Sequence, residues 1–129
     1  RIARENGADG IIVSNHGGGL LDGRLPSLRV LPDIVAACPD IPVMMDSGIR
    51  RGTDIVKALA LGAKFVFVGR PFGYAAAIGG QHGVGHAVDL LASEFKRNLS
   101  LLGLTRPEDI DKQCLAVLLN NSVFSKHLA

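Results

Sequence analysis

The sequence has no tryptophan, two cysteines and no run of the ~18 apolar residues that a membrane-spanning helix needs. Cys38 and Cys114 lie far apart and form neither a CxxC pair nor a Cys/His cluster. They exclude a disulfide scaffold and give no support to a metal site, so we expect free thiols in a reducing compartment. A charge excess is also missing, because 14 Lys and Arg oppose 12 Asp and Glu. This balance argues against a dedicated nucleic-acid binder, which would concentrate basic residues on one face.

The composition is that of one packed domain. Of the 129 residues, 47% are hydrophobic and 20% are charged, which allows a core and argues against disorder. The sequence starts without methionine and without the pattern of a signal peptide. Residues 1–6 are typical of the last turns of a helix, with Gly7 as its C-terminal cap. A start inside a helix leads us to expect a fragment of a longer protein.

Short apolar runs alternate with stretches of helical periodicity. The runs at 10–14, 41–45 and 64–68 predict strands buried in a parallel sheet. Helices are expected at 27–37, 54–61, 72–78 and 82–102, with a last one running from Thr105 through Leu118. This repeated strand–helix order predicts an α/β fold with right-handed crossovers.

Three details of the helix ends can be predicted. Thr53 is expected to cap the helix at 54–61. The Thr105-x-x-Glu108 spacing is that of a capping box, which would start the last helix. Residues 120–129 are expected to form a flexible tail.

Each predicted strand is followed by an unusual loop. The loops, at 14–19, 46–50 and 69–70, are rich in glycine, and the second and third carry arginine. Glycine lets backbone N–H groups approach an anion, a following helix N-terminus adds partial positive charge, and arginine adds a charged fork. A single Gly-Arg pair is more often a structural feature than a binding site. Three consecutive loops of this kind, however, predict a phosphate site. Such sites often follow the last two strands of a (β/α)₈ barrel.

The motifs Ser14-Asn15-His16-Gly17-Gly18, Asp46-Ser47-Gly48-Ile49-Arg50 and Val68-Gly69-Arg70-Pro71 carry a specific resemblance. In order and spacing, the chain resembles the FMN-dependent 2-hydroxy-acid dehydrogenases and oxidases, which include glycolate oxidase, L-lactate dehydrogenase and mandelate dehydrogenase. The likeness runs from about residue 3 to about residue 111. It implies that the whole chain, 1–129, is the C-terminal part of a TIM barrel, with strands six to eight and their helices.

The resemblance also implies roles for single residues. His16 matches the base that removes a proton from an L-2-hydroxy acid while flavin N5 accepts the hydride equivalent, and imidazole suits proton transfer near neutral pH. The positions that match FMN contacts are Asp46, Gly48, Arg50, Gly69 and Arg70. The simpler alternatives are a histidine that hydrogen-bonds its own turn, a helix-capping Asp46 and a solvated Arg50.

One position departs from the family pattern. Most members have an arginine after His-Gly-Gly that binds the substrate carboxylate as a bidentate pair, whereas this chain has Gly19, followed by Leu20. Glycine offers only its backbone N–H, and losing a charge-assisted contact weakens substrate binding. The substrate expected next to His16 and Gly19 is therefore lactate-like or larger, or less anionic.

The resemblance leaves the electron acceptor open among a quinone, a cytochrome, a protein carrier and oxygen. It implies a homo-oligomer in the cytoplasm, with a peripheral position at the inner membrane surface for members that reduce quinones. Because the first five βα units lie outside these 129 residues, we expect the chain alone to be inactive. Two other classes stay open: a phosphate-binding barrel of the isomerase type and a non-catalytic, self-associating module.

Overall fold

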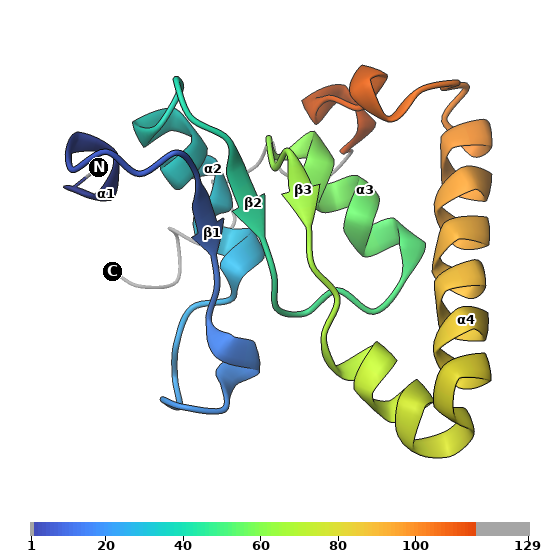
Figure 1. Ribbon diagram of the computed structural model, residues 1–129. Helices are drawn as coiled ribbons and strands as arrows, with labels where there is room; N and C mark the ends of the chain where they lie inside the picture. The colour runs from blue at the N-terminus through green and yellow to red at the C-terminus, as the bar shows by residue number, and fades with distance from the viewer. Residues whose placement is uncertain (1, 116–129) are drawn as a thin grey trace, which may run out of the picture.

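The computed structural model describes residues 2–115, which form a small parallel sheet with helices along it (Figure 1). The elements follow in the order α1 (Ile2–Glu5), β1 (Ile11–Val13), η1 (His16–Gly18), α2 (Ser27–Ala37), β2 (Val43–Met45), α3 (Gly52–Ala60), β3 (Phe65–Val66), α4 (Arg70–Leu101), η2 (Pro107–Asp109) and η3 (Lys112–Cys114).

The sheet is parallel throughout, in the order β1-β2-β3. Val13 pairs with Met45, and Met45 pairs with Val66, so the three strands end at the same edge. Helix α2 packs on β1 and β2, whereas α3 packs on β3 and against α4. The expected strand–helix order and parallel sheet are therefore confirmed, and they are consistent with part of a barrel.

The core lies between the sheet and the first two long helices. Its largest fully buried side chains are Leu31, Cys38 and Met45, each 2% exposed or less. A second cluster of buried residues joins α3 to α4 and to the segment that follows α4 in the sequence: Val56, Ala60, Leu99 and Ile110. Cys38 is buried and Cys114 is half-buried, and both are free thiols.

The structure corrects two local predictions and leaves a third untested. Helix α3 begins at Gly52, and the Asp54 carboxylate accepts the N–H groups of Arg50 and Arg51 at 3.0 Å, so Thr53 is not the N-cap. The segment after Thr105 forms two short 3₁₀ helices, η2 and η3, instead of one α-helix. The expected tail, 120–129, lies outside the described residues.

The helices expected at 72–78 and 82–102 form one element, α4, with a sharp bend. Gly80 at the bend has φ 54° and ψ −140°, a conformation open essentially to glycine alone. The bend sends the rest of α4 back along α3 (Figure 1). Within residues 2–115, no helix combines the length and the apolar character that crossing a membrane requires.

Candidate functional site

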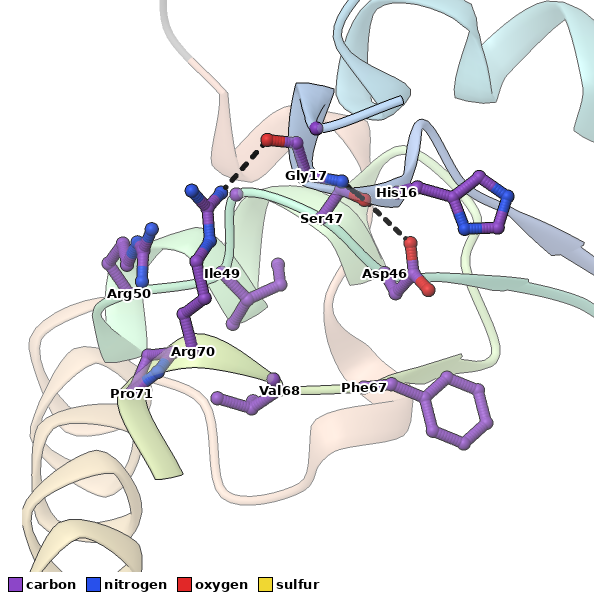
Figure 2. A pocket seen from close by; sticks show the side chains of 13 residues that line it. His16, Gly17, Asp46, Ser47, Ile49, Arg50, Phe67, Val68, Arg70 and Pro71 are labelled. Atoms are coloured by element: carbon purple, nitrogen blue, oxygen red, sulfur yellow. Dashed lines mark hydrogen bonds between the residues drawn. The ribbon is translucent and has the colours of Figure 1, made fainter. Parts of the chain in front are cut away.

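The three loops that follow the strands enclose one hollow. Its volume is about 380 Å³, and Figure 2 shows its lining side chains. Every site residue singled out from the sequence lines it: His16, Gly19, Asp46, Gly48, Arg50, Gly69 and Arg70. They meet because parallel strands carry their C-terminal loops to the same edge of the sheet.

The loop after β1 makes a tight turn that exposes the imidazole. His16, Gly17 and Gly18 have φ of 53°, 66° and 78°, so three successive residues are left-handed. Because two of the three are glycines, this run has a low conformational cost; other residues lose about 1–2 kcal/mol each in the left-handed region. The His16 N–H donates to Ser14 Oγ at 3.1 Å, which holds the start of the turn.

Gly17 is held by both neighbouring loops. Its N–H donates to Ser47 Oγ at 3.1 Å, and its carbonyl accepts from Arg70 Nη2 at 3.2 Å (Figure 2). A Cβ at this position would lie 3.0 Å from Arg70 Nη2. The turn that carries His16 is therefore fixed by contacts to the loops after β2 and β3.

The charged groups are ordered along the hollow. In Figure 2, Arg50 and Arg70 lie at one end, the His16 ring at the other, and Asp46 between them. Asp46 Oδ1 accepts from Ser47 Oγ at 2.7 Å. The order places the two guanidinium groups at one end and the imidazole at the other.

The cationic end has the features of an anion site. Helix α4 starts at Arg70, so its N-terminus adds partial positive charge beside the guanidinium groups. Gly48 and Gly69 also line the hollow, and an added Cβ would meet no heavy atom within 4 Å at either residue. An oxyanion could therefore approach the backbone there, and these residues fit a phosphate monoester.

Gly19 adds no charge to the site. Its N–H donates to the His16 carbonyl at 3.3 Å, so the one donor of this residue is used inside the turn. Arg24 does not line the hollow and gives no substitute for the missing cation. His82 and His86 are exposed on α4, as expected of surface residues.

Sequence reasoning missed two groups that build the site. The Ser47 hydroxyl links the loops, although the residue lies within a recognised motif; its small polar side chain next to an aspartate was the available signal. Phe67, at the end of the third apolar run, lines the hollow near His16 (Figure 2). Among residues 2–115, no group of three or more His, Cys, Asp or Glu forms a metal site.

Arg51 is largely exposed, and it links the loop after β2 to α4. Its guanidinium forms an ion pair with Glu94 of α4 at 2.8 Å, and Glu94 Oε2 also accepts the Gly52 N–H at 2.8 Å. The Arg51 hydrogen bond and then the Gly52 N–H lower the pKa of Glu94, while the bond to Glu94 raises the pKa of Arg51. The pair ties the loop after β2 to α4.

Comparisons with known proteins identify the family of this chain. The family model described as FMN-dependent dehydrogenase matches residues 1–117. An L-lactate oxidase of Nostoc sp. is 51% identical over 88% of this chain and 31% of its own length. An L-lactate dehydrogenase of Caulobacter sp. is 48% identical over 90% of this chain and 31% of its own.

Solved structures resemble the chain as well. An (S)-mandelate dehydrogenase structure superimposes with a TM-score of 0.84 at 42% identity, covering 87% of this chain and 31% of that one. The chain thus spans about a third of the length of these relatives. Both the family match over residues 1–117 and the identities near one half lead to one conclusion: the chain belongs to the FMN-dependent dehydrogenase family.

Proposed function

We propose that this chain forms the phosphate end of an FMN site and carries the catalytic base of an enzyme that oxidises an L-2-hydroxy acid to the 2-oxo acid. The observation that carries the proposal is the order Arg50 and Arg70, Asp46, His16 along one hollow (Figure 2). FMN has the matching order of phosphate, hydroxylated chain and redox-active ring. The relatives named for lactate and mandelate support the reaction class.

The phosphate end is the best-defined part of the proposal. Arg50 and Arg70 offer guanidinium groups, and the start of α4 adds the positive end of the helix dipole. Charge-assisted hydrogen bonds contribute about 1.5–3 kcal/mol each, so losing two arginines should remove most of the phosphate contribution. Asp46 has one oxygen bound to Ser47, which leaves the other to accept a hydroxyl of the ribityl chain.

His16 accepts the substrate proton at the end of the hollow opposite Arg50 and Arg70. FMN, when bound, supplies the acceptor for the hydride equivalent of the substrate. The exposed imidazole takes up the proton, and its turn keeps the ring at the mouth of the hollow because Gly17 is held on both sides. The role requires a ring nitrogen within hydrogen-bond reach of the substrate.

The substrate class follows from Gly19. With no cation at this position and its N–H already bonded to His16, the turn offers the substrate carboxylate no clamp of its own. Leu20 and Leu21 beside it are 76% and 60% exposed, which provides apolar surface. We therefore include lactate-like and larger 2-hydroxy acids, bound less tightly through the carboxylate than in relatives with arginine.

The 129 residues alone should bind FMN weakly and should not turn over substrate. The site here is built on three strands, and the chain spans 31% of the length of its L-lactate oxidase relative. Turnover of lactate, glycolate or mandelate by this chain alone would contradict this part of the proposal.

A fluorescence titration tests FMN binding. The chain is titrated with FMN and with riboflavin, which lacks the phosphate, and quenching of flavin emission is followed. We expect FMN to bind at least about tenfold more tightly than riboflavin. In the double variant Arg50→Ala/Arg70→Ala the preference for FMN should disappear.

The matched control removes two arginines outside the hollow. Arg24 and Arg29 are exposed and do not line it, so Arg24→Ala/Arg29→Ala changes the net charge equally. Equal loss of FMN affinity in both double variants would show general charge attraction and would overturn the assignment. Inorganic phosphate should compete with FMN in the parent chain but not in the Arg50/Arg70 variant.

A further inference from the structure

The Ser47 hydroxyl lies where the loops after β1 and β2 meet. It accepts the Gly17 N–H at 3.1 Å and the Asn15 N–H at 3.4 Å, and it donates to Asp46 Oδ1 at 2.7 Å (Figure 2). A hydroxyl has one donor and two acceptor sites. All of them are therefore used, and two of the three bonds lead to residues that flank His16.

The backbone at Ser47 is in an unfavourable conformation. Its φ is 70°, and within residues 2–115 the other non-glycine residue with positive φ is His16 itself, at 53°. Such conformations persist where surrounding contacts impose them, and they concentrate at functional sites. Here the two strained residues lie on the two loops that the Ser47–Gly17 hydrogen bond joins.

The bond to Asp46 strengthens the contact to Gly17. The short hydrogen bond to a carboxylate polarises the hydroxyl and makes its oxygen a better acceptor. A shift of Asp46, which lines the hollow beside the proposed ribityl chain, is thereby passed to the turn that carries His16. Ser47 itself acts through Gly17 and need not touch the substrate.

We propose that Ser47 is a positioning residue. Its hydroxyl fixes the turn that carries His16 relative to the loop at 46–50, which we propose binds the cofactor. The importance of this register rests on the function proposed above for His16. The hydrogen-bonded link can be tested without that function, because it concerns contacts within this chain.

The substitution Ser47→Gly isolates the hydroxyl. Glycine adopts positive φ without penalty, so the variant loses the three hydrogen bonds while the backbone conformation becomes easier. Ser47→Ala removes the same hydroxyl but keeps the unfavourable φ. An effect shared by both variants therefore belongs to the hydroxyl, and circular dichroism verifies that each remains folded.

The readouts are NMR signals of the chain. We expect both variants to exchange the Gly17 amide hydrogen about five- to tenfold faster and to shift or broaden the His16 ring signals. The control Ser100→Ala removes a hydroxyl that bonds Lys96 O within α4, and it should change neither signal. Unchanged Gly17 exchange and unchanged His16 signals in a folded Ser47→Gly chain would overturn the proposal.

FMN titration of the parent chain separates the two proposals. The titration of the parent chain reports FMN binding, whereas the His16 signals of the variants report the positioning link. If the parent chain fails to bind FMN but His16 still responds to Ser47→Gly, the cofactor proposal falls and the positioning link stands. If FMN binds and His16 does not respond, the positioning link falls alone.

Discussion

At the scale of single residues, the site depends on where a side chain is absent. Gly17 carries φ 66° and lies against Arg70, whose Nη2 would be 3.0 Å from an added Cβ. Gly19 carries no cation where the family pattern has one. Gly17 is thus required by packing and by its backbone conformation, whereas Gly19 changes what the site can bind.

Gly17→Ala should destabilise the chain by about 1–3 kcal/mol, because it combines strain at positive φ with a close contact to Arg70. Urea unfolding measures the change. Gly73→Ala is the matched control: Gly73 lies in α4 with open space around its Cβ position, and the change should be neutral or stabilising. A Gly17→Ala chain as stable as the parent would show that neither the positive φ nor the contact with Arg70 requires glycine at this position.

Gly19→Arg should raise the affinity of the FMN-loaded chain for L-lactate about tenfold or more, because it supplies a charge-assisted contact to the carboxylate. An NMR titration measures it. Lactamide, which has no carboxylate, should show no gain. An equal gain for both ligands would mean that the added side chain acts through packing instead of charge.

At the scale of elements, two helices are joined through one carboxylate. Glu94 of α4 pairs with Arg51 and accepts the N–H of Gly52 at the start of α3. Gly52 allows this approach, since an added Cβ would lie 2.6 Å from the Cβ of Glu94. The start of α3 is therefore held to the C-terminal half of α4 by charge and by close packing.

Glu94→Gln should lower stability at neutral pH, and the loss should shrink in acid. The pKa of folded Glu94 lies below its ordinary value of 4.5, so the carboxylate stabilises the fold above that value. This contribution is lost as the pH falls through the lowered folded pKa. Urea midpoints at about pH 7 and about pH 3 measure the difference.

Asp89→Asn is the control for this pair, because Asp89 is exposed on the same helix. It should leave the urea midpoint nearly unchanged at both pH values. A Glu94→Gln deficit that is as large in acid as at neutral pH would rule out the charge of Glu94 as its cause.

At the scale of the whole molecule, the sheet formed within residues 2–115 has three strands, and β1 and β3 are its open edges there. Large apolar side chains are exposed along it, among them Ile12 at 49%, Phe65 at 57% and Phe67 at 41%. Open edges and exposed apolar faces favour association with other chains. The self-associating behaviour that the sequence left open is thus a physical expectation for the isolated chain.

Sedimentation of the chain should show a mass that rises with concentration. Phe65→Lys places a charge beside the open edge of β3 and should shift the distribution toward monomer. Ser93→Lys adds the same charge at an exposed position on α4 and should not. A monomer at every concentration would show that the open edges do not associate.

The sequence by itself determined the alternation of strands and helices, the parallel sheet and the residues of the site. Continuous apolar runs predict buried strands, and glycine with arginine after each strand predicts an anion site, because both depend on local pattern and on where parallel strands end. Helix ends could be predicted less well from the sequence. Thr53 was expected to be the cap, but Asp54 is the residue that binds the free N–H groups.

Only the tertiary structure decided the contacts between loops. The hydroxyl of Ser47, the ion pair of Arg51 with Glu94 and the approach of Arg70 to Gly17 join residues 30, 43 and 53 positions apart. No local pattern encodes such pairs, since they form when the sheet brings separate loops to one edge. The sequence therefore indicated His16 and the arginines and glycines that line the site, and the packing of the loops added Ser47 and Phe67 and determined how His16 is held.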